Sequence, residues 1–268
     1  MQEINKEFKT NYAIMIKYKK LNNFREMIRY GLYSLEAIKK ILNLSISNDD
    51  RKKWNEINNI INTMIRTKQP ITKINSIDIN SCLSNSIFAV DTNTSTATCF
   101  FIGKAGNEYY FVTNRHVVDG ESKFVIRNND RSFVVKAKVH DINNKLDIAV
   151  LSAKIEYPTF PLVPMMLAES DKVIPGMPIY LIGNKSGLGI SFLAGHVAGE
   201  YNDSILLDIN SGHGDSGSPI IDEYGSVIGI LWGRYMDLEV STGENLKNLK
   251  QYLVNLKLPI TIQNKVKY

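Results

Sequence analysis

Eleven short runs of β-branched, aromatic and aliphatic residues lie between residues 87 and 232, and turns rich in Gly, Pro and Asn separate them. Runs of this length at such close spacing are typical of all-β proteins whose sheets close into barrels. The pattern therefore predicts a mainly β fold. The runs are 87–90, 98–103, 109–113, 124–127, 133–139 and 147–152, then 178–182, 190–197, 204–209, 219–221 and 227–232.

The first 80 residues have a different, helical periodicity. Apolar residues recur at three- and four-residue spacing from Phe24 to Leu42, and again from Trp54 to Ile65 after the start signal Asn48-Asp49-Asp50. Two amphipathic helices are therefore expected in a small bundle, with room for a third before them. Pro70 and the polar stretch 72–85 then read as a linker. We expect a helical extension and linker at 1–80 and a β-rich domain at 81–268.

The segment from Ser211 to Pro219 reads Ser-Gly-His-Gly-Asp-Ser-Gly-Ser-Pro. Its glycines allow backbone conformations that a side chain would forbid, so consecutive N–H groups can point into one concavity beside Ser216. Such a cup would hold an oxyanion, although ordinary Gly-Ser turns are also common. A serine nucleophile further needs an imidazole base and a carboxylate that orients it.

His116 and Asp147 are the candidates for base and orienting carboxylate. His116 is one of only four histidines and follows the strand-like run 109–113 at a position suited to a functional side chain. Asp147 begins an otherwise apolar run, where a lone carboxylate needs a partner to offset its desolvation. The alternatives are a surface-loop histidine and an ion-paired, structural aspartate.

Three blocks in this order, 113–118, 146–151 and 214–219, resemble the signature blocks of trypsin-like (chymotrypsin-fold) serine peptidases. The run 227–233 resembles the substrate-binding strand of that family. The sequence is most similar to the bacterial glutamyl endopeptidase branch, which also ends in a helix like that expected at 244–256. The resemblance covers roughly residues 86–258 and leaves the N-terminal third without a counterpart.

The resemblance implies two six-stranded antiparallel barrels of chymotrypsin type with a C-terminal helix, preceded by the helical extension. It implies a serine endopeptidase that works through an acyl-enzyme, with Ser216 as nucleophile, His116 as base and Asp147 as its orienting partner. The N–H groups of Gly214 and Ser216 would form the oxyanion hole. Neither a metal nor an organic cofactor is required, and the substrate would be a protein or peptide. The alternative is a catalytically silent, peptidase-like binding or scaffold module.

The resemblance also implies residues for substrate binding, but the specificity pocket departs from the glutamyl endopeptidase pattern. Leu231 stands where that branch has a histidine, which argues against a glutamate preference, and Glu239 could instead favour a basic side chain. Asp215 could pair with a terminus freed by cleavage before Ile87, although we favour an internal partner. The predicted binding residues are Asn210, Ser211, His213, Leu231, Trp232 and Gly233.

Charge and cysteine content bear on partners and location. Residues 1–70 hold 14 Lys/Arg and 7 Asp/Glu, a balance of +7 against +5 for the whole chain. This basic extension could contact nucleic acid, an anionic membrane or an acidic partner, but no nucleic-acid recognition motif accompanies it, and a solvated helical face is the simpler explanation of so diffuse a charge. We expect it to dock a regulatory protein or restrain the peptidase domain.

Two cysteines, Cys82 and Cys99, are too few for the disulfide framework of secreted peptidases, and both are expected to be free thiols. The first residues lack the pattern of a signal peptide, and no run of 18 apolar residues marks a membrane span. A cytoplasmic enzyme is therefore the expectation.

Overall fold

The computed structural model describes residues 2–20, 30–31, 33–34, 37–38, 40–44, 46–67, 83, 85–156, 162–260 and 262. The chain forms two compact units, Met1–Thr72 and Lys73–Tyr268. The boundary predicted near residue 80, most of the predicted linker and Cys82 lie outside the described residues, as do Phe24, Met27, Ile28, Leu32 and Leu35 of the first predicted helix.

The N-terminal unit contains helices α1 (Gln2–Lys20) and α3 (Asn48–Thr67). The start of α3 agrees with the signal at 48–50, and the Ser47 hydroxyl accepts a hydrogen bond from the Asp50 N–H at 3.1 Å, which satisfies a donor of the first turn. The rings of Phe8 and Trp54 meet edge to face with centroids 4.9 Å apart, so the apolar faces of the two helices contact each other. Neither helix, nor any other in the described part of the chain, is long and apolar enough to cross a membrane.

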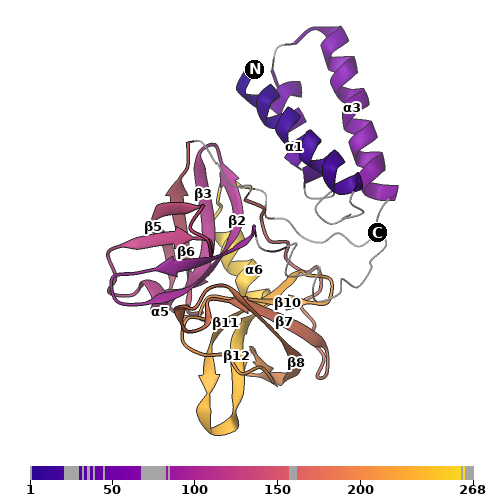
Figure 1. Cartoon of the computed structure of the whole chain (residues 1–268). Helices are drawn as coiled ribbons and strands as arrows, with labels where there is room; N and C mark the ends of the chain where they lie inside the picture. Colours follow the sequence, from indigo (N-terminus) through magenta and orange to yellow (C-terminus); the bar gives the residue numbers. More distant parts are fainter. Residues whose placement is uncertain are drawn as a thin grey trace. The chain divides into compact units, whose positions relative to one another are not determined.

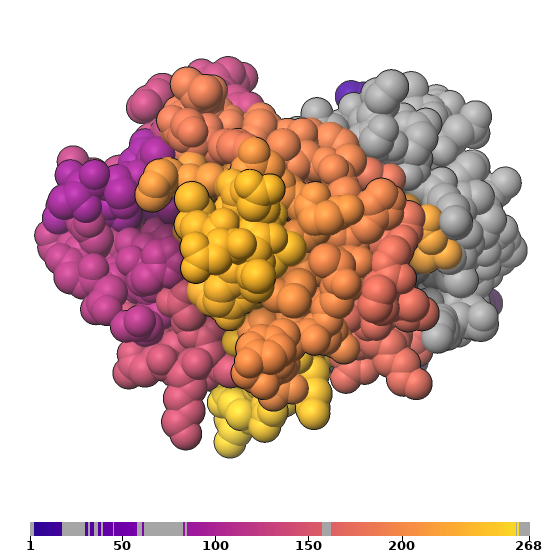
Figure 2. Space-filling model, turned by 90° about the horizontal axis from the view of Figure 1, so that it is seen from below, coloured from indigo at the N-terminus to yellow at the C-terminus, as the bar shows by residue number. Residues whose placement is uncertain are grey.

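The second unit contains two closed six-stranded antiparallel barrels, as predicted (Figure 1). The first barrel has the strand order β1-β2-β3-β6-β5-β4 and the second β10-β11-β12-β9-β8-β7. The space-filling view shows the first barrel, purple to magenta, directly against the second, salmon to yellow (Figure 2). The first comprises β1 (Ile87–Asp91), β2 (Thr96–Ala105), β3 (Glu108–Asn114), β4 (Phe124–Arg127), β5 (Val134–Asn143) and β6 (Ile148–Lys154). The second comprises β7 (Pro178–Gly183), β8 (Ser191–Tyr201), β9 (Ser204–Leu207), β10 (Pro219–Asp222), β11 (Val227–Tyr235) and β12 (Val240–Asn245).

The strand patterns follow from burial. Six of the seven residues of β6 are buried, in keeping with its apolar sequence, whereas β5 alternates exposed and partly buried residues because polar and apolar side chains alternate along it. Phe88, Phe101 and Phe111 meet in the core of the first barrel, where the ring centroids of Phe111 lie 5.8 and 5.4 Å from those of Phe88 and Phe101. Cys99 is a buried free thiol in the same core, as expected.

Strand β12 is the one strand that the sequence pattern did not predict. Its sequence, Val-Ser-Thr-Gly-Glu-Asn, contains a single aliphatic residue, yet five of its six residues are buried. It pairs with β11 on one side and with β9 on the other, so its place depends on backbone pairing rather than on an apolar face.

The C-terminal helix α6 (Leu246–Asn255) follows β12 directly and is slightly shorter than the predicted 244–256. The side chain of Asn245 caps it by accepting a hydrogen bond from the Asn248 N–H at 2.9 Å. Its buried residues, among them Leu249 and Leu253, pack in the core of the second barrel, and the Tyr252 hydroxyl donates to Asp141 of β5 at 2.8 Å. The helix therefore contacts both barrels (Figure 1).

Candidate active site

His116 lies in the short helix α5 (Arg115–Val118), which follows β3 without a connecting loop. Strand β3 pairs with β6 so that Asn114 faces Ile148, and this register brings Asp147 beside the start of α5. The Asp147 carbonyl accepts hydrogen bonds from the Arg115 N–H and from Asn114 Nδ2, at 3.1 and 3.0 Å. The backbone of the first barrel thus holds the histidine and the aspartate together before any side-chain contact is counted.

The side chains of Asp147, His116 and Ser216 form a continuous line. Asp147 Oδ2 lies 2.6 Å from His116 Nδ1, and His116 Nε2 lies 2.9 Å from Ser216 Oγ. Asp147 Oδ1 also accepts the His116 N–H at 2.9 Å. Because an ionised carboxylate only accepts, Nδ1 carries the proton toward Asp147, which leaves the lone pair of Nε2 facing the serine hydroxyl. The structure therefore brings together three residues that lie 31 and 69 positions apart in the sequence.

Arg115 is a neighbour that the sequence analysis did not single out. Its Nε lies 3.7 Å from Asp147 Oδ1, so a positive charge faces the carboxylate on the side away from His116 Nδ1. The position of Arg115 directly before His116 was visible in the sequence, but the direction of its side chain toward Asp147 was not.

The turn around Ser216 depends on two glycines in left-handed backbone conformations. Gly214 has φ +90° and Gly217 φ +83°. A Cβ on Gly214 would overlap the Asn184 carbonyl oxygen, and one on Gly217 would overlap the Thr98 carbonyl oxygen. Among the described residues, the N–H groups of Gly214 and Ser216 have no hydrogen-bond partner. Both donors of the predicted oxyanion hole are therefore free to bind an incoming oxygen.

Asp215 is fully buried beneath this turn. Its Oδ2 accepts the Gly212 N–H at 2.9 Å, whereas Oδ1 has no hydrogen-bond partner within the described ranges. Burial raises the pKa of Asp215, and the Gly212 N–H and the nearby Lys185 ammonium oppose that rise. In this chain the internal partner of Asp215 is thus a backbone N–H of its own loop.

Asn210 and His213, two of the predicted substrate-binding residues, are exposed at the ends of the segment that precedes the turn. The Asn210 side-chain oxygen accepts Arg234 Nη1, and its backbone carbonyl accepts Lys185 Nζ, each at 2.5 Å. The His213 carbonyl accepts the Ser186 N–H at 2.6 Å. Arg234 and Lys185, which no sequence motif marked, therefore converge on Asn210, a predicted substrate-binding residue.

The remaining predicted binding residues have different roles in the structure. Ser211 is buried with its Oγ 2.7 Å from Ser241 Oγ. Leu231 is a core residue whose N–H and carbonyl bond Ser218 and Gly217, so it fixes the turn through its backbone. A Cβ added to Gly233 would meet no atom within 4 Å. Glu239, by contrast, is exposed in the hairpin between β11 and β12, and no hydrogen bond or ion pair links it to Asn210.

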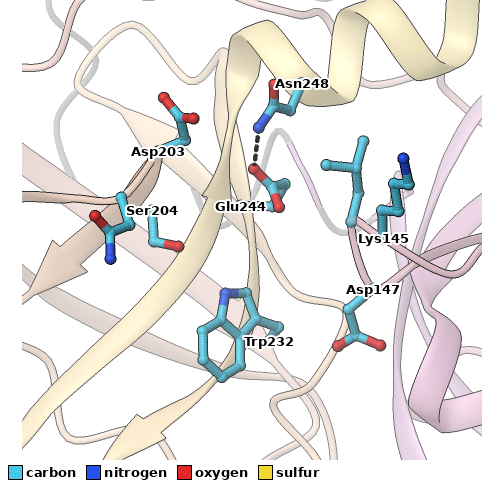
Figure 3. Close-up of a pocket in the computed structure, with 9 residues that line it drawn as sticks. Lys145, Asp147, Asp203, Ser204, Trp232, Glu244 and Asn248 are labelled. Atoms are coloured by element: carbon cyan, nitrogen blue, oxygen red, sulfur yellow. Dashed lines mark hydrogen bonds between the residues drawn. The ribbon is translucent and has the colours of Figure 1, made fainter.

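Trp232 lines a cavity of about 510 Å³ beside Asp147 (Figure 3). Three carboxylates border this cavity, those of Asp147, Asp203 and Glu244, together with the Lys145 side chain. Burial raises the pKa of Glu244, and the negative charges of Asp203 and Asp147 raise it further. Hydrogen bonds from the Asn248 side chain and the Asn245 N–H oppose the rise. Lys145, Asp203 and Glu244 left no signal in the sequence, because they come from two turns and a strand that lie far apart in the chain.

Two closed barrels with this Ser-His-Asp line define the class of chymotrypsin-like proteins. The trypsin-like peptidase domain matches residues 97–230, half of the chain. This chain therefore belongs to the trypsin-like peptidase domain family.

Named relatives are serine proteases of the DegP type. The chain is 35% identical over 129 residues to a "probable periplasmic serine endoprotease DegP-like" of Marinomonas sp. (strain MWYL1), covering 45% of this chain and 26% of that protein. It is 30% identical over 146 residues to "Protease Do-like 1, chloroplastic" of Arabidopsis thaliana, covering 50% and 33%. The chain thus spans only about a quarter to a third of the length of these relatives. Their names state a periplasmic or chloroplast location, so they do not support the expected cytoplasmic location.

Solved structures show the same fold at low sequence identity. Rv3671c from M. tuberculosis H37Rv, in an inactive form, has a TM-score of 0.58 at 18% identity, covering 71% of this chain and 98% of that one. A serine endoprotease from Yersinia pestis has a TM-score of 0.59 at 16% identity, covering 69% and 67%. These likenesses establish the double-barrel fold.

Gly214→Ala tests the backbone packing of the turn. We expect the free energy of unfolding to fall by about 2–5 kcal/mol, because a positive φ costs an alanine about 1–2 kcal/mol and the overlap with Asn184 adds to it. Gly106→Ala is the matched control, since Gly106 has φ +60° but open space around it, and should cost only about 1–2 kcal/mol. The free energy of unfolding of both variants is measured by urea unfolding, followed by Trp232 fluorescence in a Trp54→Phe background. Equal losses would mean that the turn tolerates a Cβ.

Proposed function

We propose that this protein is a serine endopeptidase that cleaves protein substrates through Ser216, His116 and Asp147. The observation that carries the proposal is the unbroken line from Asp147 Oδ2 through both His116 nitrogens to Ser216 Oγ. A surface histidine or a structural aspartate would not require this alignment across two barrels. The two unbonded N–H groups beside the serine support the same function.

The geometry supports acyl transfer in two halves. Ser216 Oγ attacks the carbonyl carbon of a peptide bond as its proton passes to His116 Nε2, and the N–H groups of Gly214 and Ser216 hold the oxyanion. The C–N bond then breaks, and His116 donates the proton to the leaving amine. Water attacks the acyl-enzyme as His116 takes its proton, which releases the acid and restores Ser216. Asp147 keeps the imidazole in the required tautomer throughout.

Substitution of the triad residues tests this mechanism. Ser216→Ala is expected to abolish labelling by a fluorophosphonate, which reacts with an activated serine. Asp147→Asn is expected to lower kcat by about 10⁴-fold, because an amide favours the wrong imidazole tautomer. The measurements are gel-based labelling and hydrolysis of a fluorogenic peptide mixture, with Asp171→Asn, an exposed aspartate, as control. A wild-type protein that neither labels nor hydrolyses would support the alternative of a silent binding module.

The substrate preference that we propose follows from the charges at Asn210. Lys185 and Arg234 both bond this residue, and neither forms an ion pair with a carboxylate of the described residues. Arg234 Nε is buried and has no hydrogen-bond partner within that part of the chain. An acidic side chain of the substrate would form charge-assisted hydrogen bonds with both cations. The finer likeness to the glutamyl endopeptidase branch remains a hypothesis, since Leu231 replaces its histidine and these cations would do a comparable task from other positions.

Peptide pairs that differ only in Glu or Gln before the scissile bond test this preference. We expect kcat/KM to favour Glu by about tenfold, which corresponds to about 1.4 kcal/mol of charge-assisted bonding. The ratio should approach one in Lys185→Gln/Arg234→Gln and remain unchanged in the control Lys172→Gln, an exposed lysine. A preference for Lys or Arg that disappears in Glu239→Gln would contradict the proposal.

The helical extension is the remaining part of the proposed function. We propose that residues 1–80, with their excess positive charge, restrain the peptidase domain or dock a regulatory protein inside the cell. Deleting residues 1–80 should then change the rate of protein cleavage or the set of bound proteins, while labelling of Ser216 persists. Pull-down and casein hydrolysis with and without the extension measure these effects. Unchanged activity, location and binding would remove the proposal.

A further inference from the structure

Thr98 on strand β2 makes a hydrogen bond with every polar group that it has. Its N–H donates to the Ser216 carbonyl at 2.9 Å, and its carbonyl accepts the Thr113 hydroxyl at 2.8 Å. Its own hydroxyl donates to the Gly214 carbonyl at 2.8 Å and accepts the Asn184 N–H at 2.9 Å. The residue is fully buried. One side chain of the first barrel thus contacts the nucleophile turn and the β7–β8 connection of the second.

The direction of the bond to Gly214 follows from the donor inventory. A hydroxyl has a single proton, and the Asn184 N–H and the Gly214 carbonyl can only donate and accept, respectively. The Thr98 hydroxyl therefore donates its proton to the Gly214 carbonyl and accepts the Asn184 N–H with a lone pair. No alternative rotamer of the hydroxyl hydrogen would satisfy both neighbours, so the bond has one polarity.

Gly214 needs such a restraint because a glycine is free to rotate about both backbone bonds. The peptide before it is held through the His213 carbonyl, which accepts the Ser186 N–H at 2.6 Å. The peptide after it is held through the Gly214 carbonyl by Thr98. Because a trans peptide is planar, the Gly214 N–H points opposite to the His213 carbonyl, so the bond to Ser186 sets its direction. The bond from Thr98 fixes the following peptide, and the two bonds together restrain both torsions of Gly214.

Asn184 makes the two restraints cooperate. Its N–H bonds Thr98 Oγ1, and its carbonyl accepts the Gly187 N–H at 2.9 Å, which closes the turn that presents the Ser186 N–H to His213. Its side chain donates to Thr96 Oγ1 at 2.7 Å, so the same turn is also anchored to β2. The Thr98 hydroxyl therefore lies where the β7–β8 connection and the nucleophile turn meet.

We propose that Thr98 is a positioning residue for the oxyanion hole: its hydroxyl bonds the Gly214 carbonyl and the Asn184 N–H, and these two bonds restrain the backbone that presents the Gly214 N–H to the transition-state oxyanion. This inference rests on the proposed function, because it assumes that Ser216 performs acyl transfer. Thr98 touches neither the substrate nor the reacting atoms. It acts through the Gly214 peptide, so its loss should weaken transition-state binding while leaving substrate binding almost intact.

Thr98→Val, which keeps the shape and removes the hydroxyl, is the decisive variant. We expect kcat to fall by about 10- to 100-fold, below the 10²- to 10³-fold effect of deleting an oxyanion-hole donor, with KM within about twofold of wild type. Thr98→Ser restores the hydroxyl and should return kcat to within about threefold. Thr242→Val is the matched control, since Thr242 is also fully buried but its hydroxyl has no hydrogen-bond partner among the described residues, and this variant should leave kcat unchanged.

Inhibition by a peptide boronic acid separates positioning from a purely structural role. Its tetrahedral adduct with Ser216 places an oxygen in the hole, so in Thr98→Val its Ki should rise by the same factor by which kcat/KM falls, while KM does not change. If Thr98→Val cannot be purified folded, Thr98→Cys, with a poor donor of similar size, takes its place with the same expectation. Equal kcat values for the Val or Cys variant and Thr98→Ser would overturn the inference.

Fluorophosphonate labelling of the wild type distinguishes this result from a failure of the proposed function. A wild-type protein that labels at Ser216, together with a hydroxyl-independent kcat, refutes the role of Thr98 alone. A wild-type protein that does not label refutes the acyl-transfer function and the inference with it.

Discussion

Backbone packs directly on backbone where the nucleophile turn meets its supports, and the rest of the site depends on that contact. Gly217 lies against the Thr98 carbonyl of the first barrel, and Gly214 against the Asn184 carbonyl of the second, with no room for a Cβ at either position. The Ser216 carbonyl accepts the Thr98 N–H across the same contact. Since His116 and Asp147 are fixed to the first barrel by backbone bonds, this contact sets the 2.9 Å distance between His116 Nε2 and Ser216 Oγ. A side chain at Gly214 or Gly217 would move Ser216 away from His116.

Charge is divided between two parts of the site. The cavity beside Asp147 has three carboxylates on its walls, and the raised pKa of Glu244 reflects burial next to Asp203 and Asp147 (Figure 3). The segment at Asn210 instead receives two cations, Lys185 and Arg234. Because an anion is disfavoured near the first group and favoured near the second, an extended substrate would gain from opposite charges at different positions along its backbone. Selectivity of this kind arises from placement rather than from overall charge.

The double barrel, the triad candidates and the glycine turn could be predicted from the sequence because each leaves a local signal. Apolar runs predict the strands, and the serine, histidine and aspartate lie in short recognisable sequence blocks. Strand β12 left no such signal, since its polar residues are buried by pairing and by bonds such as that between Ser241 and Ser211. The first predicted helix cannot be compared over most of its length, because it lies largely outside the described residues.

The residues that the sequence could not reveal share one property: their partners are distant in the chain and their own neighbourhood is ordinary. Thr98 is one threonine among several near the start of β2. The Thr96 hydroxyl donates to Asp91, five positions away, whereas that of Thr98 donates to Gly214, 116 positions away. Lys185 and Arg234 become a pair only through Asn210, which both contact. The reacting groups of such a site are therefore readable as motifs, whereas the groups that hold them in place depend on how closed barrels bring turns together. A chain that retained every motif but lost the Thr98 hydroxyl would keep its nucleophile and base and still lose the direction of a donor on which the reaction depends.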